Sequence, residues 1–283
     1  MSYRFKTTDK TVPRGLRRIA RKQLDASLAI LDAAPVPDAA GLHELRRTVK
    51  RMRGLLRLVR PAFDDFNRED ACLRDAGRQV AGLRDRDAML VVFDQLTGGT
   101  PDPELHDALS ERLSHAAPDA VAAAQAHRAL LADQRARIED WRFAGRDFAI
   151  LAPGLEDELD RARRLLRDWR RHHDEEAMHE LRKAVKAHGF HAALLAPIWP
   201  EMMLPHQQQT ARLGELLGLA RDHGLIAEHL DDLPGGEELA LRARAQVATL
   251  QGEAILLARR LLAESGASIT RRWGAWWDLW RDA

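Results

Sequence analysis

Apolar residues recur every three or four positions along nearly the whole chain, which is the period of an α-helix. The composition agrees, because the chain is rich in Ala, Leu, Arg, Asp and Glu and poor in the aromatic and β-branched runs typical of strands. No window alternates with a period of two. The pattern predicts an all-α protein of about ten helices.

Proline and glycine residues mark where these helices are expected to break. The predicted breaks lie at Pro35–Pro37, Pro61, Gly98–Gly99 with Pro101 and Pro103, Pro118, Pro153, Pro197 to Pro205, Pro234–Gly236 and Gly266.

One segment of the chain occurs twice. Residues 43–50 read HELRRTVK and residues 179–186 read HELRKAVK, an offset of 136 from His43 to His179. We call these two segments the His motifs. A second pair, the Gly motifs, comprises GLRD at residues 82–85 and GLARD at residues 218–222. Two motifs in the same order at nearly the same offset indicate a duplication of roughly 140 residues.

A duplicated helical chain of this kind predicts two tandem bundles of the four-helix type. We place the first at residues 1–147 and the second, which ends in a Trp-rich helix, at residues 148–283. The two bundles together are expected to form one domain.

A basic stripe accompanies the apolar seam of the helix predicted from about residue 38 to residue 60. The seam consists of Leu42, Leu45, Val49, Met52, Leu56 and Val59. The residues that directly follow these are His43, Arg46, Lys50, Arg53, Arg57 and Arg60. Like charges at helical spacing repel by a few tenths of a kcal/mol per pair, so the stripe indicates an anion that neutralises it. The alternative is an ordinary solvated basic face.

The second His motif favours the anion site, because a merely solvated surface need not repeat its residue identities. His179, Arg182 and Lys186 repeat the positions of His43, Arg46 and Lys50. Arginine forks bind phosphate oxygens in pairs, and lysine adds a point charge. Histidine would donate hydrogen bonds that strengthen as it protonates, or could instead cap a neighbouring helix.

Further arginines cluster near these motifs, and each group could also be merely solvated. Arg14, Arg17 and Arg21 share one face of the first predicted helix, Arg78 leads to the first Gly motif, and several arginines crowd residues 163–171. The candidate ligand residues beyond the two stripes are Arg14, Arg17, Arg21, Arg78, Arg84 and Arg221. We expect Asp85 and Asp222 to lie at helix ends, as caps or as anchors for an arginine. Gly82 and Gly218 are expected to allow close helix approach.

Together the four motifs resemble the CHAD domain family, named for conserved histidines in an α-helical domain. The resemblance extends from about residue 12 to about residue 263. It implies two similar four-helix bundles related by pseudo-twofold symmetry, with basic residues of both halves around a central groove or pore. It also implies binding of inorganic polyphosphate and association with polyphosphate granules. Some members carry an attached triphosphate-processing domain, for which this chain has no room.

The second half departs from the family pattern. The family usually continues its second His motif with Lys-x-x-Arg-Tyr, whereas this chain has Lys186, then Gly189 and Phe190. His188 or His191 would substitute only in part for the missing arginine. We therefore expect the first half to dominate binding.

The charge balance and the motifs present favour binding over catalysis. Lys and Arg number 44 and Asp and Glu 43, so anion affinity must come from segregated charge. A zincin motif would need a second histidine where Arg47 and Lys183 stand, and no phosphate-binding glycine loop or nucleophile signature around Cys72 is found. We expect no enzyme activity, cofactor or metal. The alternatives are a phosphohydrolase or phosphotransferase acting on polyphosphate or nucleotides, and a general binder of nucleic acid or other polyanions. Nucleic acid is disfavoured because the stripes contain no aromatic residue for base stacking.

A single cysteine, no signal peptide and no apolar span predict a cytoplasmic protein, with polyphosphate granules as an expected location. Near the C-terminus, Trp273, Trp276, Trp277 and Trp280 follow helical spacing. They either pack on the second bundle or provide a contact for a homo-oligomer or a granule surface.

Overall fold

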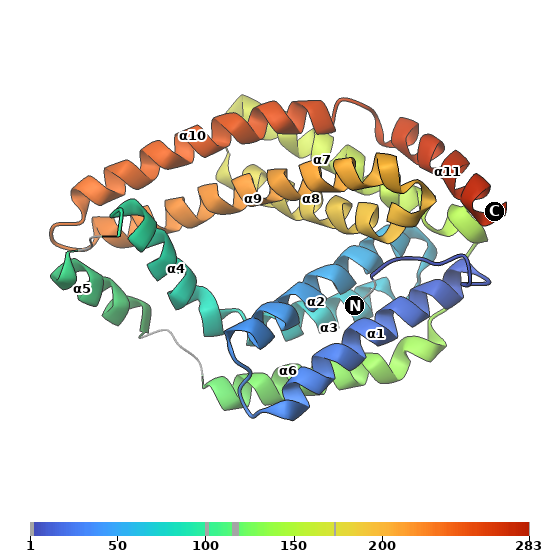
Figure 1. The fold of residues 1–283 in the computed structure, drawn as a ribbon, viewed down its shortest axis with the longest axis horizontal. Coiled ribbons are helices and arrows are strands. Elements are labelled where there is room, and N and C mark those ends of the chain that lie inside the picture. The colour runs from blue at the N-terminus through green and yellow to red at the C-terminus, as the bar shows by residue number, and fades with distance from the viewer. Residues whose placement is uncertain (1–2, 100–101, 115–118, 173, 283) are drawn as a thin grey trace.

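The computed structural model of the protein describes residues 3–99, 102–114, 119–172 and 174–282, without the side chains of residues 82–88 and 114. Within these ranges the chain forms α-helices and short 3₁₀ turns and no strand, which confirms the predicted all-α class. The helices are α1 Val12–Ala33, α2 Ala39–Val59, α3 Phe66–Gln79, α4 Gly82–Leu96, α5 Pro103–Ser114, α6 Ala120–Arg137, α7 Ala152–His172, α8 Glu175–Leu195, α9 Pro200–Asp231, α10 Glu237–Leu261 and α11 Gly266–Asp282 (Figure 1).

The two His motifs lie on helices of identical length that begin in the same way. The side chain of Asp38 caps α2 by accepting from the Gly41 amide, and Asp174 caps α8 by accepting from the Glu176 amide. A shift of 136 residues maps Asp38 onto Asp174 and the whole of α2 onto α8. This agreement supports the interpretation of the chain as a duplication.

Several of the predicted breaks are turns that require glycine. Gly98, Gly99 and Gly235 have φ values of 65°, 81° and 78°, in the left-handed region that favours a residue without a Cβ. Pro205, in contrast, does not end a helix as predicted. It lies inside α9, near the start, where proline removes only one hydrogen bond of a long helix.

One continuous apolar core runs through both halves of the chain. It includes Leu45 and Leu56 from α2, Leu155 from α7 and Leu181 from α8. At Gly154 a Cβ would overlap the carbonyl oxygen of Leu58, so α7 crosses directly against the backbone of α2. The first and second halves therefore pack into each other rather than enclosing separate cores.

A smaller second core lies at the far end of the molecule. It joins α4 and α5 to the adjacent ends of α9 and α10, at the left in Figure 1. Phe93, Leu109, Ile226 and Leu230 are buried there. Both cores thus contain residues from the two halves of the chain.

The Trp-rich helix α11 packs against the main core. Trp273 and Trp277 are each only 1% exposed, so the predicted oligomer or granule contact cannot use them in the folded chain. Trp276 and Trp280 are half-buried against the same core.

The N-terminal segment lies beside α11. The ring of Phe5 meets the edge of Trp277 at 5.3 Å between centroids, and Arg281 Nη1 donates to the Asp9 carbonyl oxygen at 2.7 Å. The two ends of the chain are therefore held together. In the part of the chain that the structure describes, no helix is both long and apolar enough to cross a membrane.

Candidate functional site

The two helices with the His motifs, α2 and α8, pack together and border a small cavity of about 220 Å³. Its walls are formed by Lys50, Arg53, Gly54, Arg57, His179, Arg182, Lys183, Lys186, Ala187 and Phe190. No aspartate or glutamate is among these residues, so we call it the acid-free cavity. The cations come from both halves of the chain and converge on one space.

A larger groove of about 700 Å³ adjoins the acid-free cavity, because Lys50, Arg182, Lys186 and Phe190 line both. This wide groove is also lined by His43, Arg46, Arg47, Arg51, Val185, Gly189, Ala193, Gln207, Thr210, Ala211, Gly214, Glu215 and Asp222. The predicted stripes of the two His motifs are therefore brought together in one continuous basic surface.

Two glycines of α9 make room for the central cations. A Cβ on Gly218 would lie 3.1 Å from Arg182 Nη2, and one on Gly214 would lie 3.3 Å from Lys186 Cγ. Gly214 and Gly218 are four residues apart, and so are Arg182 and Lys186. Gly218 thus makes room for an arginine side chain of α8, the helix that packs beside α9.

The first His motif has a related contact. Arg46 Nη1 donates to the carbonyl oxygen of Ala81 at 2.9 Å, directly before Gly82. The arginine of each His motif therefore meets the start of the Gly motif in its own half. Sequence spacing alone did not reveal this pairing.

The central cations are held at an electrostatic cost. Burial, together with the charges of Arg182 and Lys50, lowers the pKa of Lys186 to about 8. Burial also lowers the pKa of Arg182, with Arg221 and Arg46 adding to the effect and Asp222 opposing it. An anion bound among these groups would relieve this cost.

His179 is shielded from protonation in the free protein. Burial lowers its pKa, and the neighbouring charges of Lys183 and Arg221 lower it further. Its Nδ1 atom is buried without a hydrogen-bond partner among the described residues. Protonation of His179 was expected to strengthen anion binding. Because the charges of Lys183 and Arg221 disfavour that protonation, the gain requires a bound anion that first offsets them.

Acidic residues from other helices neutralise part of the basic stripe. Arg53 forms a two-pronged ion pair with Asp70 of α3, at 2.8 and 2.9 Å. Arg57 lies 3.3 Å from Glu158 of α7, whose side chain is only 9% exposed. The repulsion within the stripe is therefore met partly by the protein itself, which the sequence of α2 alone did not show.

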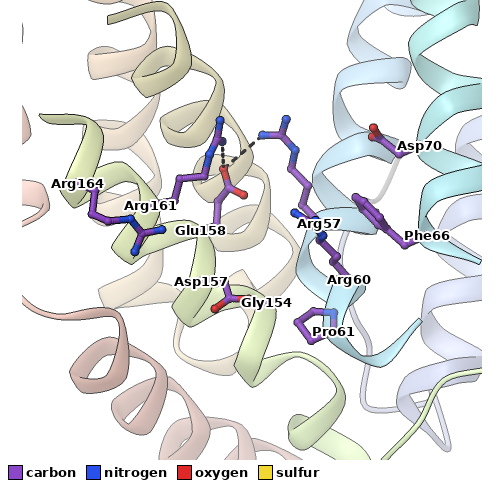
Figure 2. A pocket seen from close by; sticks show the side chains of 10 residues that line it. All are labelled: Arg57, Arg60, Pro61, Phe66, Asp70, Gly154, Asp157, Glu158, Arg161 and Arg164. Atoms are coloured by element: carbon purple, nitrogen blue, oxygen red, sulfur yellow. Dashed lines mark hydrogen bonds and ion pairs between the residues drawn. The ribbon is translucent and has the colours of Figure 1, made fainter. Parts of the chain in front are cut away.

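The contact of Arg57 with Glu158 belongs to a further cavity of about 720 Å³, which we call the α2–α7 cavity. Figure 2 shows Arg161 and Arg164 of α7 on one side, with Arg57 and Arg60 on the other. Glu158 lies between Arg57 and Arg161, at 3.3 and 3.1 Å. Arg57 lines this cavity and the acid-free cavity alike, so the two adjoin.

Other candidate residues lie outside these cavities. Arg17 Nε donates to the Trp141 carbonyl oxygen at 3.2 Å, Arg21 pairs with Glu139 at 3.0 Å, and Arg14 is exposed on the same helix. Their helix face is directed at the chain that follows α6. The structure therefore does not bring Arg14, Arg17 and Arg21 to the α2–α8 surface.

Of the candidates near the Gly motifs, Arg221 lies beside the acid-free cavity, because His179 lines both that cavity and the one that Arg221 lines. Arg78 is exposed and pairs with Asp75 at 3.2 Å, and the side chain of Arg84 lies outside the described residues. Arg221 lines another cavity beside His179. Asp222 lies inside α9 and not at a helix end, and its charge acts on Arg182, as an arginine anchor would.

His188 and His191 do not replace the arginine missing at Gly189. Both are buried, 3% and 0% exposed, on the side of α8 that faces the core. His191 Nε2 lies 2.9 Å from the Gly54 carbonyl oxygen, and His188 Nε2 lies 2.7 Å from His206 Nε2. The expectation that they extend the basic stripe was wrong, because the helical period places them about half a turn away.

Comparison with known proteins places these features in context. A family model described as the CHAD domain matches residues 18–231. The fold is similar to that of PptA from Streptomyces chartreusis, with a TM-score of 0.57, 16% sequence identity, and coverage of 88% of this chain and 95% of that one. A search of curated proteins found no match.

Proposed function

The chain belongs to the CHAD domain family, and on this premise we propose that it binds inorganic polyphosphate without catalysis. The binding site comprises the acid-free cavity and the adjoining wide groove. Arg182, Lys186 and Lys50 lie at the junction of the two and are its central residues.

The acid-free cavity is the observation that carries this proposal. Cations of both halves line it without any acidic residue among the described lining, in a chain whose total charge is only +1. Because the cations are segregated in this way, the positive electrostatic potential is concentrated in the cavity, where a polyanion with repeating charges binds most favourably. The association of the family with polyphosphate supports the same ligand.

Polyphosphate has no nucleobases, and this fits the residues that line the two cavities. Phe190 is the one aromatic residue among the described residues of both cavities. It packs in the α2–α8 contact, where a Cβ on Gly54 would lie 2.9 Å from Phe190 Cβ. Proteins that bind single-stranded nucleic acid usually present several aromatic rings for base stacking. Polyphosphate needs none.

A competition titration tests this proposal. We expect long-chain polyphosphate to bind at near-physiological salt and to resist displacement by single-stranded DNA, duplex DNA or ATP. Arg182→Gln should weaken binding at least about tenfold, since it removes a charge-assisted contact shared by both cavities. The matched control is Arg128→Gln, which removes an exposed arginine of α6 that pairs with Asp32 of α1.

Three results would contradict the proposal. Equal competition by DNA would make the surface a general polyanion binder. Sustained phosphate release from polyphosphate or nucleotides with Mg²⁺ or Mn²⁺ would make the protein an enzyme. Equal affinities of the Arg182→Gln and Arg128→Gln proteins would remove the site from the α2–α8 surface.

We also propose that the protein acts in the cytoplasm at polyphosphate granules, because a granule presents the ligand at high density. A fluorescent fusion should colocalise with stained granules, and the Arg182→Gln fusion should spread through the cytoplasm. Colocalisation that persists in the variant would assign targeting to another surface.

A further inference from the structure

The α2–α7 cavity contains a carboxylate placed where a phosphate group would bind. Glu158 lies 3.3 Å from Arg57 Nη1 and 3.1 Å from Arg161 Nη1, bridging α2 and α7 (Figure 2). We propose that this cavity is a second phosphate subsite, occupied by Glu158 in the free protein and opened when a long polyphosphate chain displaces it. The inference rests on the proposed function.

The cavity is lined by four arginines and by the carboxylates of Asp70, Asp157 and Glu158, of which Asp70 already pairs with Arg53. Arg57 and Arg161 offer guanidinium groups to one oxygen, and Arg60 and Arg164 face the same space from opposite walls (Figure 2). Paired arginine forks from two directions match the tetrahedral oxygens of a phosphate unit. The carboxylate of Glu158 satisfies the same donors when no ligand is present.

The subsite is placed to receive a chain from the acid-free cavity. Arg57 belongs to both cavities, so the two sets of cations adjoin at its side chain. Lys50, at the junction with the wide groove, precedes Arg57 on α2 by seven residues, which is about 10 Å along the helix. A linear ligand that lies along α2 therefore reaches Glu158 only if it extends beyond the acid-free cavity.

A second carboxylate connects this position to α8. Arg161 also forms an ion pair with Glu180, and Glu180 pairs with Lys183, which lines the acid-free cavity. Arg161 therefore keeps a carboxylate partner when Glu158 moves away. Arg57 has no second carboxylate partner among the described residues, so the phosphate unit that displaces Glu158 must supply its counter-charge.

The arrangement makes binding depend on chain length. A short polyphosphate fits within the acid-free cavity and leaves Glu158 in place. A long chain reaches Arg57 and Arg161, and the free energy of the added contacts must first offset the loss of two charge-assisted hydrogen bonds. Replacing Glu158 by its neutral amide lowers that cost, because the amide oxygen accepts weaker hydrogen bonds than a carboxylate does.

Calorimetric titration of the full-length protein with tripolyphosphate and with long-chain polyphosphate tests the inference. In Glu158→Gln we expect long-chain polyphosphate to bind about tenfold more tightly. Tripolyphosphate should gain a second binding equivalent at the opened subsite. The control is Glu253→Gln on α10, which changes the net charge equally at an exposed pair with Arg212 of α9.

Glu158 is nearly buried, so its replacement could act through stability alone. Thermal melting of each variant shows whether it folds. Arg164→Gln provides an independent test, because Arg164 lines the α2–α7 cavity and is not among the residues that line the acid-free cavity. It should weaken long-chain binding roughly threefold and leave tripolyphosphate binding unchanged.

The outcomes separate the two proposals. If the unaltered protein binds no polyphosphate, the proposed function is wrong. If it binds, but Glu158→Gln behaves like Glu253→Gln in both affinity and stoichiometry, then Glu158 is only a structural ion pair and this inference is overturned. Equal long-chain affinity in Arg164→Gln and the unaltered protein would overturn it as well.

Discussion

At the scale of single residues, the protein keeps unfavourable charges where its ligand is proposed to bind. Lys186 is partly buried between Arg182 and Lys50, with its stem against Gly214. Its pKa of about 8 shows that the folded protein disfavours the charged form relative to the unfolded chain. The presence of a residue that lowers stability in this way is explained if that residue contributes to ligand binding.

Binding of polyphosphate should weaken as the pH rises through about 8, because free Lys186 loses its proton there while an anion would hold it. Lys186→Gln should lack this part of the pH dependence and bind about tenfold more weakly at pH 7. It should also gain about 1 kcal/mol of unfolding free energy at pH 7, where the unaltered lysine is charged and penalised. Titration at pH 7 and pH 9 with thermal melts checks both effects. Identical pH profiles for the two proteins would show that Lys186 does not contact the ligand.

Much of the proposed binding surface could be predicted from residue spacing alone. The stripe of α2 and its repeat on α8 predicted that His43, Arg46, Lys50, Arg182 and Lys186 act together, and the structure places them around one groove. Their acidic partners could not be predicted in this way. Glu158 and Asp70 belong to other helices, and only the packing of those helices brings them to Arg57 and Arg53.

At the scale of helices, local sequence signals predicted the boundaries of helices better than they predicted the contacts between helices. The apolar seam predicted a helix from about residue 38 to residue 60, and α2 spans Ala39–Val59 with Asp38 as its cap. Gly218 was expected to allow close helix approach, and it makes room for the Arg182 side chain of α8, which packs beside α9. A direct contact of two helix backbones occurs at Gly154, which no repeated motif marked, because the need for glycine there comes from the crossing of α7 over α2.

Gly154→Ala should lower the unfolding free energy by roughly 3 kcal/mol, because its Cβ would overlap the backbone of Leu58 and Arg57 and neither helix can shift without disturbing the core. Gly252→Ala on α10 is the matched control. Its Cβ would enter open space, so it should raise stability by about 1 kcal/mol through helix propensity. Denaturant unfolding measures both. Equal unfolding free energies for the two variants would show that α2 and α7 pack less closely at this crossing than the structure indicates.

At the scale of the whole molecule, the sequence repeat does not correspond to separately packed units. The main core takes residues from α1, α2, α7, α8 and α9 together, and the second core joins α4 and α5 to α9 and α10. A repeat in the sequence predicts similar elements, but it does not specify whether the two copies pack apart or interlock. Here the His-motif helices pack against each other, and the proposed site exists only where they meet.

Neither half should therefore fold alone. We expect fragments 1–147 and 148–283 each to lack a cooperative thermal transition, since each would expose core residues such as Leu56 or Leu155. Produced together, they should associate and recover both the transition and polyphosphate binding. A sharp transition in either fragment by itself would establish it as an autonomous domain.

The contact between Phe5 and Trp277, with the hydrogen bond from Arg281 to the Asp9 carbonyl oxygen, makes the polypeptide nearly a closed ring. A linker joining the existing ends would complete that ring, and new ends could be opened at the exposed turn of Gly98 and Gly99. Such a circular permutant changes the order in which the helices leave the ribosome without altering which helices touch. The ligand surface therefore depends on the neighbours each helix acquires in space and not on the order in which the gene encodes them.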